Sequence, residues 1–162
     1  RERVLFFEIM KVAFVSLISR DGRPLYIYNN GEREEDGKGE GEGIENFLKY
    51  NFLSHMSLDV FESTYAPNTS EKPGLLFVQD GVFIYGYEMS IGVKVVVGII
   101  RDKITLEEWN EKDLTELDYV KNIIDGVCKE FVRYSCSSFR EGPIEEINSN
   151  IFDKRISKVI NI

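Results

Sequence analysis

The stretch GLLFVQDGVFIYGYEMSIGVKVVVGII, residues 74–100, predicts three consecutive antiparallel strands. Asp80 and Gly81 favour a tight hairpin turn between the first two strands, because both residue types accept the backbone conformations that such turns require. The second strand ends before the tripeptide SIG, and residues 93–100 then form the third. This last segment is apolar on both alternating faces, which is typical of a strand that is covered on both sides.

Two further strands are predicted upstream of this stretch. Residues 11–19, KVAFVSLIS, are also apolar on both faces, and Asp21 and Gly22 then favour a turn into a strand at residues 25–29. Residues 30–43 follow, with the sequence NGEREEDGKGEGEG. Since this acidic, glycine-rich segment cannot bury enough apolar surface to order itself, we expect a mobile loop there.

Three helices complete the chain. The first is predicted over residues 44–65, and the second from Asp113, whose side chain would cap the helix in a capping box with Glu116. The third would open at Pro143 and run to residue 160.

The order β-β-α-β-β-β-α-α predicts an α+β fold with a five-stranded antiparallel sheet. The two strands that are apolar on both faces, residues 11–19 and 93–100, are expected at its centre. The first helix would cover one face and the last two helices the other. We interpret residues 11–162 as a single domain. Residues 1–10 form an N-terminal extension that is either native or artificially added, with Met10 as a possible native start.

Composition excludes several classes of function. The 162 residues include 20 Lys and Arg against 28 Asp and Glu, so the net charge is 20 − 28 = −8. Such a charge repels the phosphates of nucleic acids and of anionic membranes. No apolar run reaches the roughly 20 residues that span a bilayer. We therefore expect a cytoplasmic protein that binds no nucleic acid and does not insert into a membrane.

The first helix is apolar on too many sides for a helix that covers one face of a sheet. On a helical wheel, Asn51, His55 and Glu62 form a polar strip on one side, whereas Ser54 and Ser57 form only a thin polar break on the other. Two apolar arcs lie between these polar positions: Phe47, Tyr50, Leu58, Phe61 and Tyr65 in the first, and Leu48, Phe52, Leu53, Met56 and Val60 in the second.

We expect the sheet to cover one arc and a protein partner to cover the other, because soluble monomers avoid large exposed apolar patches. The predicted partner-binding residues are those of the second arc together with Asp59, which lies inside it: Leu48, Phe52, Leu53, Met56, Asp59 and Val60. In the alternative, residues 67–74 cover the second arc. Asp59 would accept a hydrogen bond either from its own chain, which we favour slightly, or from the partner, since an unpaired buried carboxylate is costly.

No motif indicates catalysis, a cofactor or a metal. The segment GKGEGEG lacks the Ser or Thr that follows the lysine of a phosphate-binding loop. His55 is the only histidine, and Cys128 and Cys136 do not form a CxxC pair. An enzyme or small-molecule binder that uses a pocket between sheet and helix remains a rival from another class.

Three quoted segments resemble a known family. LKYNFLSHMSLDVFES is similar to the first helix of the sedlin-like subunits of TRAPP, which have the longin fold. VAFVSLISRDGRPLYIY resembles their opening hairpin, and GLLFVQDGVFIYGYEMSIGVKVVVGI their three-strand meander. The resemblance covers about residues 11–152.

This resemblance implies a non-catalytic assembly or adaptor subunit of a vesicle-tethering complex that is a guanine nucleotide exchange factor for Rab GTPases. The implied partners are other TRAPP subunits and, indirectly, a Rab GTPase; a homodimer is also compatible. The complex acts in ER-to-Golgi and Golgi traffic, so peripheral association with those membranes is expected. A longin regulatory domain of a SNARE and a small subunit of a vesicle coat adaptor are the alternatives.

Overall fold

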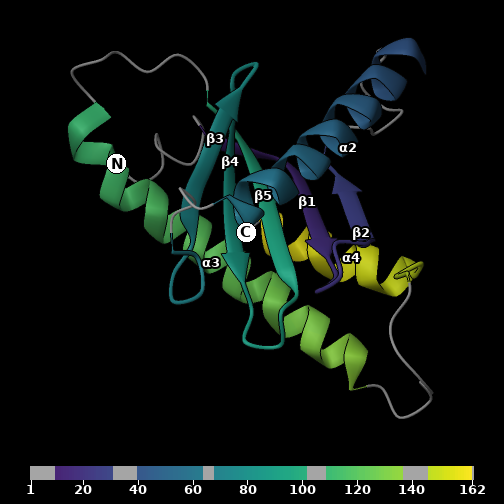
Figure 1. Ribbon diagram of the computed structural model, residues 1–162. Coiled ribbons are helices and arrows are strands. Elements are labelled where there is room, and N and C mark those ends of the chain that lie inside the picture. The colour runs from purple at the N-terminus through teal and green to yellow at the C-terminus, as the bar shows by residue number, and fades with distance from the viewer. Residues whose placement is uncertain (1–9, 31–39, 64–67, 102–108, 137–145, 162) are drawn as a thin grey trace.

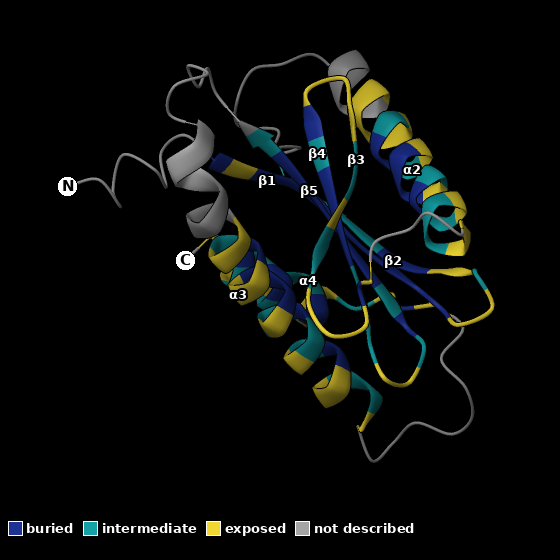
Figure 2. Ribbon diagram, turned by 60° about the vertical axis from the view of Figure 1, so that its left-hand side comes forward, coloured by how far each residue is buried: buried dark blue, intermediate teal, exposed yellow. Residues whose placement is uncertain are grey.

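The computed structural model describes residues 10–30, 40–63, 68–101, 109–136 and 146–161, and of residues 40–44, 101 and 109–116 the backbone alone. Three layers make up this part of the chain (Figures 1 and 2). Helix α2 (Glu40–Glu62) covers one face of a sheet, and helices α3 (Trp109–Ser135) and α4 (Asn150–Ile160) cover the other.

The sheet contains five antiparallel strands in the order β2-β1-β5-β4-β3. They are β1 (Met10–Ile18), β2 (Pro24–Asn29), β3 (Gly74–Gln79), β4 (Val82–Glu88) and β5 (Lys94–Arg101). The predicted α+β fold is confirmed. The first and fifth strands lie next to each other inside the sheet, as their two apolar faces indicated, and β2 and β3 form its edges.

The β3–β4 turn follows the predicted chemistry. Asp80 has φ 52° and Gly81 has φ 77°. Positive φ at both central residues defines the type I′ turn, whose twist matches that of the flanking strands.

Helix α2 differs from its prediction at both ends. It begins at Glu40 and ends at Glu62, whereas the sequence predicted residues 44–65. Part of the predicted loop therefore belongs to the helix. Residues 31–39, the rest of that loop, and residues 64–67 lie outside the described part of the chain.

Helix α3 also begins earlier than predicted. Its first residue is Trp109, which places Asp113 inside the helix, so the prediction that Asp113 caps it is wrong. Glu111 and Lys112 have good helix propensities and extend the helix before Asp113.

Helix α4 begins later than predicted, at Asn150 instead of Pro143. Ser149 is its N-cap, with extended backbone (φ −143°) and a side chain that accepts a hydrogen bond from the Phe152 N–H. Residues 146–149 are not helical, because Ile147 is buried and donates its backbone N–H to the Leu25 carbonyl oxygen of β2 at 2.8 Å. Residues 143–145 lie outside the described range.

Each face of the sheet has its own core. The face toward α3 and α4 has the larger one, which includes Phe131, Phe152 and Ile156. The buried residues of the core beneath α2 are Ala13, Phe14, Ile18, Tyr50, Leu53, Val82, Ile84 and Val96.

Two serines lie at the centre of the α2–sheet contact. Ser54 and Ser57 are buried, and the Ser54 hydroxyl is hydrogen-bonded to that of Ser16 on β1, with 2.6 Å between the oxygens. The Ser57 hydroxyl donates to the Ser54 carbonyl oxygen. The expectation that the sheet covers one apolar arc is therefore wrong. The sheet faces the thin polar break of Ser54 and Ser57, and it buries the residues of both arcs that lie nearest to this break.

Replacing Ser54 with alanine should lower the free energy of unfolding by about 1–3 kcal/mol, because the buried Ser16 hydroxyl then loses its partner. Removing both hydroxyls, in Ser16→Ala with Ser54→Ala, should cost less than the sum of the single changes. Urea unfolding of the four proteins measures this coupling, and strictly additive effects would contradict the hydrogen bond.

Candidate functional site

The side of α2 that faces away from the sheet carries large exposed apolar side chains. Leu48 and Phe52 are each 61% exposed, and they lie four residues apart, so they are neighbours on the helix surface. Asp59 is exposed on the same side. We call Leu48, Phe52 and Asp59 the α2 outer face; Met56 and Val60 are half-buried at its margin.

Leu53 does not belong to this surface. Its side chain is 1% exposed and lies in the core beneath α2. The structure thus brings together Leu48, Phe52 and Asp59 from the predicted set and points Leu53 toward the sheet. A contact between a partner and Leu53 would require this side chain to leave the core.

Asp59 forms no hydrogen bond or ion pair with any residue whose side chain the structure describes. The local hydrogen bond expected from the sequence is thus not formed within this part of the chain. Its carboxylate is exposed to solvent and is available as an acceptor for an incoming donor.

The segment after α2 does not cover the outer face where it is described. Within residues 68–73, Thr69 is buried and its carbonyl oxygen accepts the Glu88 N–H at 3.0 Å, which fixes the segment to the end of β4. Leu48 and Phe52 remain exposed.

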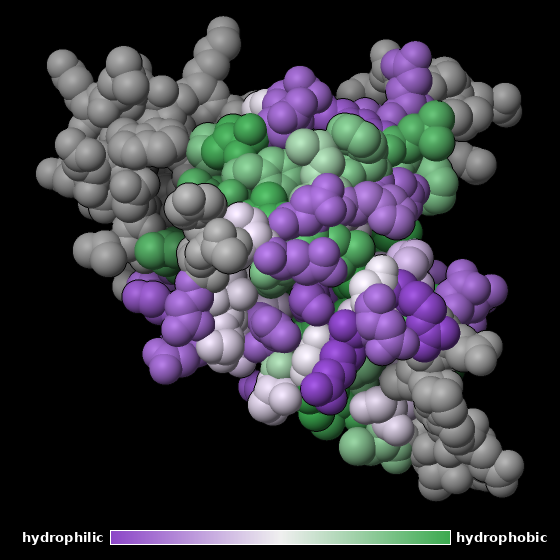
Figure 3. Space-filling model, in the orientation of Figure 1, coloured by the Kyte–Doolittle hydropathy of each residue, from purple (hydrophilic) through white to green (hydrophobic). Residues whose placement is uncertain are grey.

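Other exposed apolar residues are more scattered. Val132 on α3 and Ile151 on α4 are exposed, and isolated residues of this kind are normal on protein surfaces. On α2, by contrast, Leu48 and Phe52 are both exposed, one turn apart on the same side of the helix. Apolar side chains gather over α2 and the neighbouring edge of the sheet, interrupted by polar ones (Figure 3). The clustering on one helix makes the α2 outer face a candidate interaction surface.

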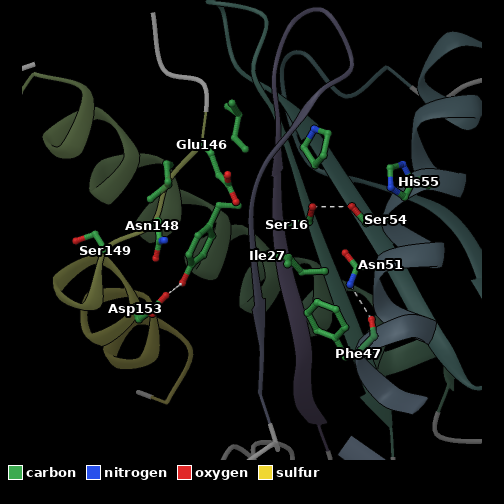
Figure 4. A pocket seen from close by; sticks show the side chains of 14 residues that line it. Ser16, Ile27, Phe47, Asn51, Ser54, His55, Glu146, Asn148, Ser149 and Asp153 are labelled. Atoms are coloured by element: carbon green, nitrogen blue, oxygen red, sulfur yellow. Dashed lines mark hydrogen bonds between the residues drawn. The ribbon is translucent and has the colours of Figure 1, made fainter. Parts of the chain in front are cut away.

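A groove of about 430 Å³ crosses edge strand β2, between α2 and residues 146–149 (Figure 4). On one side of the strand, Asn51 and His55 project from α2, and the Asn51 amide donates to the Phe47 carbonyl oxygen at 2.9 Å. On the other side, the Tyr26 hydroxyl donates to Asp153 Oδ1 at 2.5 Å. Burial, and then this bond to the Asp153 carboxylate, raise the pKa of Tyr26, so the phenol stays protonated.

The thiol of Cys128 is half-buried. Burial, with a smaller contribution from Asp125, raises the pKa of the Cys128 thiol to about 11, so it is not a reactive thiolate at neutral pH. Across the ranges that the structure describes, no three His, Cys, Asp or Glu residues are placed to hold a metal ion. In the same ranges, no helix has the length and hydropathy to cross a membrane.

Comparisons with known proteins point to one family. The sequence model of the family described as Sedlin matches residues 17–161. The TRAPP-associated protein TCA17 of Saccharomyces cerevisiae (strain ATCC 204508 / S288c) is 29% identical to the chain over 133 residues, which cover 79% of each protein. The residues matched by the family model include the whole of α2.

Proposed function

The chain belongs to the sedlin family, and from this premise we propose that it is a non-catalytic assembly subunit of a TRAPP-type vesicle-tethering complex. In this proposal the chain contributes a binding surface, and the α2 outer face contacts another subunit of the complex. The exposure of Leu48 and Phe52 on one side of α2 is the observation that carries it.

The similarity to a protein named TRAPP-associated supports the choice of complex. By the same resemblance, the complex would act on Rab GTPases as a nucleotide exchange factor in ER-to-Golgi and Golgi traffic. The chain would contact the Rab only through other subunits. It would be cytoplasmic and reach Golgi membranes as part of the complex.

The proposed contact is large enough to matter energetically. Full burial of a leucine or phenylalanine side chain contributes about 1.5–3 kcal/mol. Part of this gain offsets the loss of translational and rotational freedom on association. Asp59 lies at the same surface, where a hydrogen bond from the partner would fix the orientation of the two proteins more than it would add affinity.

Affinity purification of the tagged chain from cells, read by quantitative mass spectrometry, tests this proposal. Wild-type protein should recover TRAPP subunits, and Phe52→Asp or Leu48→Asp should lower their recovery at least tenfold, because a buried charge replaces an apolar contact. Val132→Asp is the matched control: it makes the same kind of change at an exposed apolar residue on the opposite layer and should leave recovery unchanged.

Thermal unfolding followed by circular dichroism establishes that each variant is folded. If folded Phe52→Asp and Leu48→Asp proteins recover TRAPP subunits as well as the wild type does, the α2 outer face is not the contact. If the wild type recovers SNAREs, coat subunits or only copies of itself, the proposed complex is wrong.

A further inference from the structure

Strand β2 forms an edge of the sheet, and part of its backbone faces away from β1. Asn30 donates its N–H to the Ala13 carbonyl oxygen, and β1 and β2 continue from there as an antiparallel pair in which Ser16 lies opposite Ile27. Because hydrogen-bonded and non-hydrogen-bonded pairs alternate in such a ladder, the backbone N–H and C=O groups of Ile27 and Asn29 point outward.

One outward group of β2 is already used in the way that a strand partner would use it. The carbonyl oxygen of Leu25 accepts the N–H of Ile147, from the segment that precedes α4. No backbone hydrogen bond joins the outward groups of Ile27 and Asn29 to another described residue. Within the described ranges, the edge of β2 is therefore occupied at Leu25 and has no strand partner at Ile27 and Asn29.

The groove around β2 provides walls for both faces of such a strand. Phe47, Asn51 and His55 of α2 form one wall. Asp153 and residues 146–149 form the other (Figure 4). Side chains of an added strand would alternate between these walls, because successive residues of a strand point to opposite faces.

The charged residues that line the groove favour a ligand of the opposite charge. Its charged lining residues are Glu146 and Asp153, and the described lining contains no Lys or Arg. The chain as a whole has a net charge of −8. A basic peptide is therefore attracted both by the groove and by the overall field, whereas an acidic one is repelled.

We propose that the groove binds an extended, basic peptide segment of a partner protein, which adds a strand to the open edge of β2 at Ile27 and Asn29. Backbone hydrogen bonds to these residues hold the segment, as in other proteins that bind peptides by adding a strand to a sheet. A Lys or Arg of the peptide contacts Glu146 or Asp153. This site is separate from the α2 outer face, so it does not depend on the proposed function.

Selection of random eight-residue peptides displayed on phage, with the complete chain as bait, tests the proposal. Enriched peptides should contain Lys or Arg together with residues that favour strands. Their affinities, measured by fluorescence polarisation, should fall at least tenfold with Glu146→Lys. Glu62→Lys makes the same charge change at an exposed residue of α2 outside the groove and should have little effect.

Two further measurements separate strand addition from simple charge attraction. Two peptides with every second residue N-methylated, offset from each other by one residue, should behave differently. The peptide whose methylated nitrogens face β2 should not bind, and the other should still bind, because only one edge of the peptide faces β2. Amide hydrogen exchange at Ile27 should slow when the peptide binds. The proposal is overturned if no peptide is enriched, if Glu62→Lys weakens binding as much as Glu146→Lys does, or if neither N-methylation register nor the Ile27 amide responds.

Discussion

Replacement of Leu53 with alanine is expected to lower the free energy of unfolding by about 2–5 kcal/mol, the range for a buried leucine whose cavity only partly closes. Leu53 is almost fully buried beneath α2, where Phe14, Tyr50 and Ile84 belong to the same core. The effect should be large, because the core beneath α2 is the smaller of the two and has few other side chains to fill the space.

Leu48→Ala is the matched control, since it makes the same change on the same helix. Leu48 is 61% exposed, so its replacement should alter the free energy of unfolding by no more than about 0.5 kcal/mol. Urea unfolding of both variants measures the difference. Similar losses in the two variants would mean that α2 is rotated relative to the orientation described above, and the assignment of its outer face would then fail.

Replacement of Gly98 with alanine is the second change expected to have a large effect. Gly98 lies in β5, and a Cβ atom there would come within 2.4 Å of Phe14 Cε1 and 3.1 Å of Val82 Cγ1. The Phe14 ring is fully buried and stacks on Tyr50 of α2, with 5.2 Å between ring centroids. Since the ring has little room to move, overpacking should cost about 1–3 kcal/mol or more.

A second substitution separates overpacking from a change in strand propensity. In Gly98→Ala with Phe14→Leu, the smaller side chain leaves room for the new methyl group, so the combined loss should be smaller than the sum of the two single losses. Thermal or urea unfolding of the single and double variants gives the comparison. A Gly98→Ala protein as stable as the wild type would show that Phe14 does not lie against this glycine.

The strands could be predicted from the sequence because their signals are local. Alternating and doubly apolar segments marked all five strands, and the residue types at Asp80 and Gly81 indicated the turn that the structure contains. The positions of β1 and β5 inside the sheet followed from the same pattern, since only a strand covered on both sides is apolar on both faces.

The orientation of α2 could not be predicted in the same way. Polarity assigned Ser54 and Ser57 to a break between the apolar arcs, yet both are buried against the sheet. Their hydroxyls can be buried because Ser54 pairs with Ser16, which lies 38 residues away in the sequence. A helical wheel contains no information about that partner, so it misplaced Leu53 at the predicted contact surface.

The boundaries of α4 and the groove at β2 depend on tertiary contacts as well. The sequence after Pro143 has a suitable pattern for a helix, but the hydrogen bond from Ile147 to Leu25 holds residues 146–149 along β2. That contact also creates one wall of the groove. Asn51, Glu146 and Asp153 were not predicted as site residues, because nothing in their local sequences indicates that they face the same strand.

Photo-crosslinking from the α2 outer face tests the central claim most directly. A p-benzoylphenylalanine introduced at position 52 of the chain in cells, with the same residue at position 132 as control, captures whatever protein lies within reach of each side chain. We expect position 52 to capture a TRAPP subunit and position 132 to capture none. Capture of TRAPP subunits from position 132 alone, or of no TRAPP subunit from position 52 of a folded protein, would contradict the account.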